Sequence, residues 1–279
     1  MLLGVHVSIS GGIINGLEQA KRLRCTALQM FSHSPRTWRG AAIDDREIER
    51  FIALRRQYGI ESLVLHVPYL INLAAPDNTL WRRSIESFTE DIRVADRLKA
   101  DYFVTHIGGH KTKTISWGIK RFSRALNTIL SRKTTRCTIL LENTAGSGSG
   151  LGGSFEHIAE IFGRVKKRKS LGVCLDTAHA FQAGYDISTR GRTGGFVRLL
   201  EDTIGVDRVK VVHLNDSKTR LASHHDRHWH IGKGCIGSEG LSAIINHPLL
   251  RGKVFILETP KMEEGEDRRN LKKVGRLRR

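Results

Sequence analysis

The chain has 279 residues, of which 39% are hydrophobic and 27% charged, a composition typical of a globular protein with one large domain or two small ones. The formal net charge of +18 predicts a polyanionic partner, with nucleic acid as the first candidate. The alternatives are that this charge serves solubility or belongs to a basic tail unrelated to function. No apolar run approaches the roughly 20 residues that cross a bilayer, which argues against a membrane protein.

The cysteines and the first residues of the chain bear on its cellular location. Cys25, Cys137, Cys174 and Cys235 are widely spaced without a CxxC pair, which argues against a disulfide framework and against a thiolate zinc site. Cys137 and Cys174 lie in apolar runs and are expected to be buried. We find no pattern of a signal peptide and therefore expect a cytoplasmic, reducing location.

Eight short apolar runs recur along the chain and are separated by amphipathic segments. The runs, predicted to be strands, are residues 2–6, 27–31, 62–66, 102–106, 138–142, 172–176, 209–213 and 254–258. The helical patterns are residues 48–58, 80–98, 117–130, 155–165 and 197–204. Eight such units predict an α/β fold, a single-domain (β/α)8 TIM barrel, rather than a doubly wound sheet with a second domain. We assign residues 1–262 to the barrel and residues 263–279 to a basic C-terminal tail.

Six of the predicted strands end on a side chain that can bind a metal. These residues are His66, His106, Glu142, Asp176, His213 and Glu258. The carboxyl ends of TIM-barrel strands converge on one face, where active sites are built, so the six residues are expected to meet there. A single histidine at a strand end is more often a hydrogen-bonded core residue than a ligand. Six ionisable residues indicate a metal cluster, because burying uncompensated carboxylates is costly.

A histidine-rich segment, residues 211–230, supplies further candidates. It carries Asp226 and His228, whose spacing lets both side chains face the same way in an extended loop. His179 follows Asp176 by three residues and shares its face in a first helical turn. These additions bring the candidates to nine, which suits three ions with one bridging carboxylate better than one tetrahedral zinc. Taken alone, the segment is equally compatible with a solvated loop.

Seven segments resemble a single family. They are GVHVSISGG, YLINLA, LLENTAGSGSGLG, GVCLDTAHAFQAGYD, VHLNDSK, DRHWHIGKGCIG and ILETP. Together they are similar to the endonuclease IV family of apurinic/apyrimidinic (AP) endonucleases, from about residue 2 to about residue 260. The resemblance implies a barrel that binds three zinc ions (Zn2+), with Glu142 bridging the first two. The ligands would be His66, His106 and Glu142 for the first ion, Glu142, Asp176, His213 and Glu258 for the second, and His179, Asp226 and His228 for the third.

The resemblance also implies a reaction. The family hydrolyses the phosphodiester 5′ to abasic sites in double-stranded DNA, leaving a 3′-hydroxyl and a 5′-deoxyribose phosphate, and removes 3′-blocking groups. Paired zinc ions supply a water of lowered pKa for this chemistry. We expect Glu142 and Glu258 to be catalytic, although Glu258 either orients the water or only binds metal. We further expect a monomer without an obligate protein partner, associated with the nucleoid when it acts on DNA.

Two loops are expected to contact damaged DNA. The resemblance places Arg36, Tyr69 and Leu70 on positions that enter the minor groove. Trp38 is equally suited to contact DNA and to pack beneath its loop. Proline at position 35 and Val-Pro at positions 67–68 replace polar residues of the family, which leaves the details of these contacts open.

His6 and four histidines that follow a strand end or lie in the segment 211–230 match no ligand position. His6 is expected to hydrogen-bond to a ligand. The other four are open to a hydrogen bond with a ligand, a phosphate contact or a surface position: His110, His224, His225 and His230.

Two other functions compete with the nuclease. A metal-dependent sugar isomerase or epimerase of the xylose-isomerase-like barrel type shares ligands at the strand ends, but it needs fewer of them and no strong positive charge. A nucleic-acid-binding protein with a structural metal would have a closed cage of four ligands.

Overall fold

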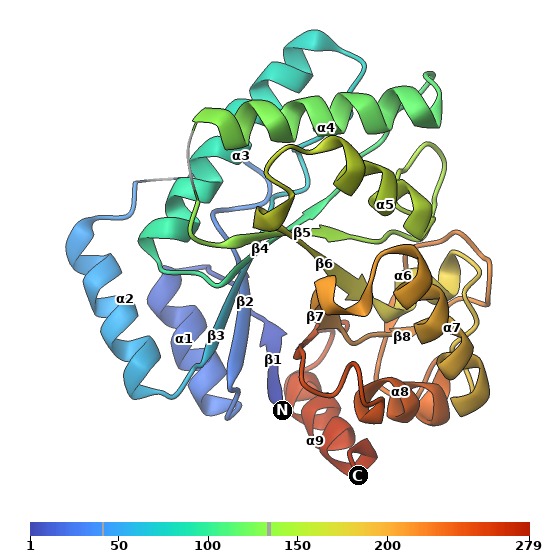
Figure 1. The fold of residues 1–279 in the computed structure, drawn as a ribbon. Helices are drawn as coiled ribbons and strands as arrows, with labels where there is room; N and C mark the ends of the chain where they lie inside the picture. Colours follow the sequence, from blue (N-terminus) through green and yellow to red (C-terminus); the bar gives the residue numbers. More distant parts are fainter. Residues whose placement is uncertain (41, 133–134) are drawn as a thin grey trace.

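Eight parallel strands close into a barrel in the computed structural model, which describes residues 1–40, 42–132 and 135–279 (Figure 1). The order around the barrel is β1-β10-β7-β6-β5-β4-β3-β2. The strands are β1 (Leu2–His6), β2 (Ala27–Phe31), β3 (Ser62–His66), β4 (Tyr102–His106), β5 (Thr138–Glu142), β6 (Leu171–Asp176), β7 (Val209–His213) and β10 (Val254–Leu257). All neighbouring pairs are parallel, which confirms the predicted single-domain TIM barrel.

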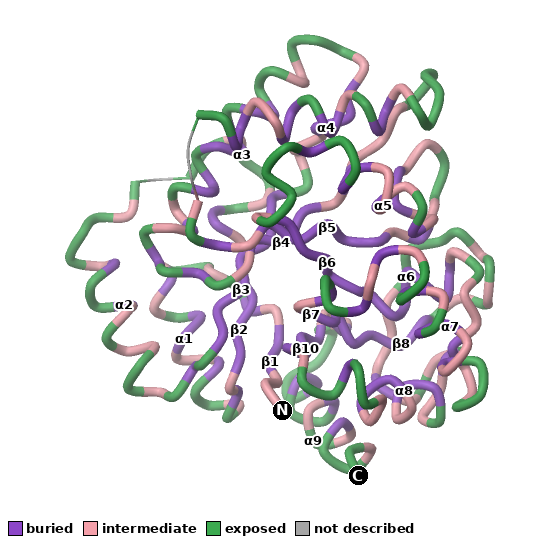
Figure 2. The backbone as a smooth tube through the Cα atoms, in the orientation of Figure 1, coloured by how far each residue is buried: buried purple, intermediate pink, exposed green. Residues whose placement is uncertain are grey.

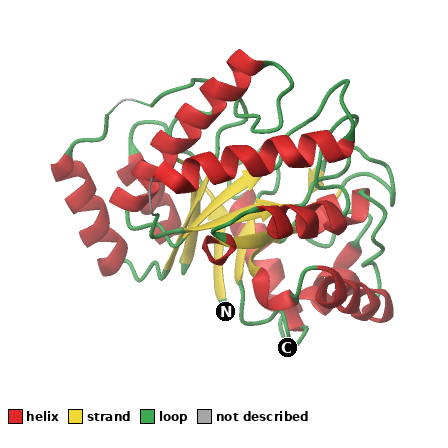
Figure 3. Ribbon diagram, turned by 45° about the horizontal axis from the view of Figure 1, so that its top comes forward, coloured by secondary structure: helices red, strands yellow, loops and turns green. Residues whose placement is uncertain are grey.

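Helices cover the outside of the barrel, as Figure 3 shows. They are α1 (Ile13–Arg22), α2 (Asp45–Gln57), α3 (Asn78–Arg97), α4 (Ile115–Arg132), α5 (Phe155–Arg164), α6 (Thr177–Gln182), α7 (Arg190–Thr203), α8 (Gly237–Asn246) and α9 (Glu266–Leu277). Helices α2 and α3 begin earlier than the predicted residues 48 and 80. Their first turns are polar and lack an apolar signal, but the carboxylates of Asp44 and Asp77 accept backbone N–H groups there. No described helix is both long and apolar enough to span a membrane.

The apolar core has two layers, which appear as the buried strands and inner helix faces in Figure 2. Inside the barrel, β-branched and small side chains such as Val64, Val104 and Val211 fill the axis. Outside it, the strands and helices share a larger cluster that includes Phe51, Phe88 and other aromatic side chains. Cys174 belongs to the inner layer and Cys137 to the outer one, so both are buried as predicted.

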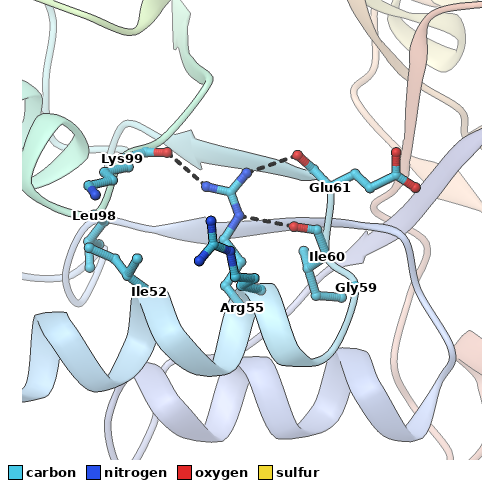
Figure 4. A pocket seen from close by; sticks show the side chains of 8 residues that line it. Ile52, Arg55, Gly59, Ile60, Glu61, Leu98 and Lys99 are labelled. Carbon is cyan, nitrogen blue, oxygen red and sulfur yellow. Dashed lines mark hydrogen bonds between the residues drawn. The ribbon is translucent and has the colours of Figure 1, made fainter.

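The amino ends of the strands are fastened by polar contacts. Arg55 of α2 donates hydrogen bonds to the backbone oxygens of Lys99, Ile60 and Glu61, which lie before β3 and β4 (Figure 4). It also pairs with Asp101 at 2.7 Å. Arg55, Ile60, Glu61 and Lys99 line a surface cavity of about 340 Å³ at the end of the barrel opposite the strand termini that carry the candidate ligands. We interpret this end as structural.

Within the basic segment 263–279, residues Glu266–Leu277 form α9. Val274 and Asn270 of α9 are buried, and the Asn270 side chain donates to the Thr259 hydroxyl and accepts from the Ile231 backbone N–H. No sequence signal indicated this helix, because the abundance of lysine and arginine hid the few residues that pack inward. Helix α9 is thus attached to the loops at the carboxyl end of the barrel.

Candidate metal centre

The carboxyl ends of the strands bring together the six residues predicted from the strand ends. The first group joins β3, β4 and β5. The Nε2 atom of His66 lies 3.2 Å from the Glu142 Oε2 atom, and the Nε2 atom of His106 lies 3.0 Å from the same oxygen. His66 and Glu142 are buried, whereas the side chain of His106 is about one-third exposed. One carboxylate oxygen therefore faces two imidazoles in a space that water reaches from one side.

The second group joins β5, β6, β7 and the residue after β10. The Nδ1 atom of His213 lies 2.9 Å from the Glu142 Oε1 atom, 3.1 Å from the Glu258 Oε2 atom and 3.9 Å from the Asp176 Oδ2 atom. The ligand-capable atoms of these four residues lie within 4.8 Å of one another. Glu142 thus presents one oxygen to each group, which is the arrangement that a bridging carboxylate requires.

A short hairpin completes a third group. Strand β8 (Asp216–Ser217) pairs antiparallel with β9 (His228–Trp229), and this pairing carries His228 to the barrel mouth. The Nε2 atom of His179 lies 3.2 Å from the Asp226 Oδ1 atom and 3.4 Å from the His228 Nε2 atom. Asp176 borders this group too, since its Oδ2 atom lies 3.5 Å from His228. The side chain of Asp226 is 54% exposed, so the third group is the most open of the three.

The hairpin is held by Asp216, an acidic residue that is not part of the cluster. Its buried carboxylate accepts hydrogen bonds from the backbone N–H groups of Ser217, Gly234 and Ile236. Glycine is needed at position 234, because a Cβ atom there would lie 2.3 Å from the Ser217 carbonyl oxygen.

Hydrogen bonds on the outer nitrogens orient the histidines. The Nδ1 atoms of His66, His179 and His228 lie 2.7, 3.0 and 3.2 Å from backbone carbonyl oxygens, so Nε2 is the inner atom in each ring. His213 is reversed: its Nε2 atom lies 2.7 Å from Gln29 Oε1, and Nδ1 points inward. A neutral ring that donates outward directs a lone pair at a carboxylate oxygen about 3 Å away. The lone pair and the carboxylate oxygen repel each other, and a cation between them would remove this repulsion. The donor set therefore fits a group of divalent ions.

Three buried side-chain amides that were not predicted from the sequence support the ligands. Gln29 donates to the Glu258 Oε1 atom at 2.6 Å. Asn215 donates to the Asp176 Oδ2 atom at 2.7 Å, and its Oδ1 atom accepts from the Glu258 backbone N–H. Asn143 exchanges two hydrogen bonds with the Asp176 backbone. Gln29 was detectable as an amide within an apolar strand, whereas the two asparagines directly follow strand-end segments and resemble loop residues.

The pKa values show how strongly these groups interact. Burial alone would raise the pKa of Glu142, but the charges of His106 and His213 hold it well below its usual range. Burial would lower the pKa of His179, but Asp176, Asp226 and Glu142 raise it to about 10. Burial likewise opposes ionisation of Asp226, yet the hydrogen bond from His179 and its charge lower the pKa of Asp226 to about 2. The cluster favours ionised carboxylates beside cations.

Comparison with known proteins identifies the family. Residues 17–277 match the model of the xylose isomerase-like TIM barrel. The chain is 42% identical to a probable endonuclease 4 of Halothermothrix orenii over 279 residues, which is 100% of both proteins. The chain belongs to the endonuclease IV family. A second relative, the probable endonuclease 4 of Nitrosopumilus maritimus, is 36% identical over 98% of this chain and 99% of its own.

Solved structures agree with this assignment. The crystal structure of endonuclease IV from Thermus thermophilus matches with a TM-score of 0.88 at 36% identity, covering 99% of this chain and 98% of that one. A D-tagatose 3-epimerase-like protein matches with a TM-score of 0.76 at 21% identity, covering 99% and 97% of the two chains, which shows a common fold only. This endonuclease IV family member is therefore an enzyme of the nuclease class.

Four further histidines of this endonuclease IV family member contact its framework. His6 lies 3.1 Å from the Glu258 Oε1 atom, where the sequence placed it as a hydrogen-bonding partner of a ligand. His110, His224 and His230 hold loops: their Nδ1 atoms contact the Lys113 carbonyl, the Ala145 carbonyl and the Asn270 amide respectively. His225 is exposed.

The three residues predicted to contact DNA lie in loops at the barrel mouth. Arg36 is exposed, and so is Tyr69, at 71%. The Tyr69 ring packs edge-on against Phe31 at 5.3 Å, and Phe31 in turn contacts His66, so Tyr69 adjoins the first metal group. Leu70 is partly buried. Trp38 packs against Arg83 of α3, which favours its structural role beneath the loop.

Proposed function

We propose that this enzyme hydrolyses the phosphodiester 5′ to abasic sites in double-stranded DNA, leaving a 3′-hydroxyl and a 5′-deoxyribose phosphate. One observation carries the proposal: Glu142 offers one oxygen to His66 and His106 and the other to His213. This sharing suits a pair of ions set side by side, which phosphodiester hydrolysis uses to hold both attacking and leaving oxygens. Membership of the endonuclease IV family supports the same conclusion.

The nine predicted ligands fit three zinc ions in the assignment given above. Zinc supplies, when bound, a water that loses its proton near neutral pH and positive charge that balances the phosphate. The residues of the chain contribute orientation. Asp176 lies between the second and third groups, at 3.9 Å from His213 and 3.5 Å from His228, and is suited to serve either. The open third group, bounded by the exposed Asp226, is suited to the phosphate because the substrate must enter there.

Glu142 and Glu258 are the proposed catalytic carboxylates. The Glu258 Oε1 atom accepts from Gln29 and lies beside His6, so only its Oε2 atom faces the centre. Because Oε1 already accepts a hydrogen bond, Glu258 is better suited to bind metal and orient a water through Oε2 than to accept and release a proton. The same centre would remove 3′-blocking groups, since that reaction breaks the same kind of bond.

Recognition of the abasic site is assigned to Arg36, Tyr69 and Leu70. Arg36 and Tyr69 are exposed, and Tyr69 adjoins the first metal group through Phe31, which suits this face to reach the space left by a missing base; Leu70 follows Tyr69 in the same loop. The net charge of +18 favours duplex DNA as the partner. We propose that the enzyme acts as an intracellular monomer without an obligate protein partner, bound to the nucleoid when it repairs DNA.

Cleavage of a duplex with one tetrahydrofuran abasic analogue tests the function. This analogue cannot undergo β-elimination, so only hydrolysis cuts it. We expect a cut 5′ to the analogue with a 3′-hydroxyl, lost on treatment with a zinc chelator and restored by zinc. No cut by protein shown to hold its metal would refute the proposal and favour the sugar isomerase or epimerase, which the comparisons support through the fold alone.

A further inference from the structure

One face of α3 contacts the loop that carries Arg36. Arg83, Ser87 and Asp91 are spaced four residues apart, so their side chains lie on one face of the helix. Ser87 and Asp91 are buried, at 6% and 1% exposure, and Arg83 lies at the exposed end. All three contact the segment 32–38, which follows β2. We call these three residues the α3 seat.

The α3 seat holds the loop at both of its ends. At the start of the loop, the Asp91 Oδ1 atom accepts a 2.7 Å hydrogen bond from the Ser32 hydroxyl and lies 3.2 Å from the His33 Nε2 atom. At the far end, the Ser87 hydroxyl donates to the Trp38 carbonyl oxygen at 2.8 Å. The guanidinium of Arg83 stacks on the Trp38 ring, 4.3 Å from its centroid.

Between these anchors, a tight turn presents Arg36. The Thr37 backbone N–H and hydroxyl both donate to the Ser34 carbonyl oxygen at 3.1 Å, and the Nδ1 atom of His33 lies 2.9 Å from the same oxygen. The anchors at 32–33 and 38 thus close a short span with Arg36 at its exposed tip. A shift of either anchor would move the guanidinium directly.

Two cavities border the loop. A cavity of about 630 Å³ is lined by His33, Trp38 and Asp91, and another of about 750 Å³ is lined by Trp38 and Ser87. Trp38 lines both cavities, as do Arg39 and Glu86. Beside these cavities, hydrogen bonds and stacking hold the loop to one helix face. The attachment of this loop to α3 depends on a few contacts, and a single substitution can remove each of them.

We propose that the α3 seat positions Arg36 for recognition of the abasic site, so that Ser87 and Asp91 are positioning residues that act through Arg36. The inference rests on the proposed function and adds the element that sets its specificity. A pre-organised Arg36 enters the base gap without first ordering its loop, and the free energy of binding is not spent on that ordering. Loosening the seat should therefore weaken binding of abasic duplex and leave the chemical step unchanged.

The test compares Asp91→Ala, Asp91→Asn and Ser87→Ala with wild type on the tetrahydrofuran duplex. For Asp91→Ala we expect KM to rise about five- to tenfold, the effect of one or two lost hydrogen bonds, with kcat within about twofold. Asp91→Asn keeps an acceptor for Ser32 and should restore KM to within about threefold of wild type. Ser87→Ala removes a single hydroxyl and gives a smaller rise in KM, which keeps the test decisive if Asp91→Ala does not fold.

Two controls separate positioning from general damage. Glu160→Gln on α5 removes one negative charge from an exposed ion pair with Arg164 and should leave KM unchanged. In an Arg36→Ala background, Asp91→Ala should raise KM by a further factor of less than about two, because its effect on KM depends on Arg36. An equal increase in KM from Asp91→Ala in the presence and in the absence of the Arg36 side chain would overturn the proposal.

Hydrogen exchange of the amides of residues 34 and 36–38 in the DNA-free protein gives an independent readout. These amides should exchange faster in Asp91→Ala than in wild type, while those of β5 are unchanged. Unchanged exchange together with unchanged KM would also overturn the inference while leaving the nuclease assignment intact. Failure of wild type to cut the abasic duplex, with normal exchange, would overturn the assigned function and the role of the seat in it.

Discussion

Glu142→Gln is the substitution that should damage the metal centre most. The carboxylate is fully buried, and its two oxygens lie within 3.2 Å of three imidazole nitrogens, those of His66, His106 and His213. Glutamine keeps the shape but removes the charge and turns one of these oxygens into an N–H donor. Loss of a supporting hydrogen-bond partner typically costs about 10–100-fold in metal affinity, so loss of a shared ligand should cost at least about 100-fold for two ions.

The assay measures metal content and cleavage on the same samples. Zinc bound per chain after dialysis against a weak chelator should fall from about three to about one in Glu142→Gln. We expect the cleavage rate of the tetrahydrofuran duplex to fall by about 10³-fold or more, equivalent to about 4 kcal/mol of transition-state stabilisation. Glu160→Gln is the charge-matched control on the exposed surface of α5. Full metal content with cleavage within about threefold of wild type would refute the bridging role.

Four further predictions follow from particular contacts. Arg36→Ala should weaken binding to abasic duplex more than to intact duplex in a salt-matched titration, and equal losses would contradict a role in damage recognition. Gln29→Met should lower zinc affinity about 10–100-fold, measured by chelator competition, because Glu258 and His213 lose their shared partner. Burial lowers the pKa of His33, but the hydrogen bond and charge of Asp91 raise it overall, so the pair stabilises the fold below pH 6.5 and loses this effect as the pH rises through the raised pKa. The melting temperature of Asp91→Asn should thus differ from wild type more at pH 6 than at pH 9. Val274→Ala should lower the free energy of unfolding, measured by chemical denaturation, by about 2 kcal/mol because Val274 of α9 is buried. An unchanged free energy of unfolding would support a loose tail.

The barrel and the strand-end residues could be predicted because one physical constraint governs both. Parallel strands covered by helices need continuous apolar runs, and a polar residue that closes such a run must lie at the mouth. That reasoning located His66, Glu142 and His213 within the segments that the structure assigns to β3, β5 and β7. It also located Glu258, which directly follows β10.

The third group and the supporting amides were harder to derive from the sequence. Asp226 and His228 reach the mouth through pairing of β8 with β9, two-residue strands that are too short to leave a periodic pattern. Their spacing made them candidates, but only the resemblance assigned them to a third ion. Asn215 contacts Asp176 across 39 positions, and no local signal reports a contact of that range. Helix α9 was missed for a related reason, since its buried residues are few among many charged ones.

The charges of the cluster explain why a buried polar site of this size suits the proposed reaction. With neutral imidazoles, the four carboxylates among the candidate ligands carry four negative charges, and three divalent cations would bring six positive ones. The excess of two positive charges, held in a largely buried site, would attract a phosphodiester and stabilise the further negative charge that develops during hydrolysis. Without cations, the same carboxylates are balanced by protons on the histidines, as the raised pKa values of His106 and His179 indicate. Protons and metal ions therefore compete for the same inner nitrogens, and the hydrogen bonds that Gln29 and the backbone carbonyls make to the outer nitrogens leave those inner positions available to metal.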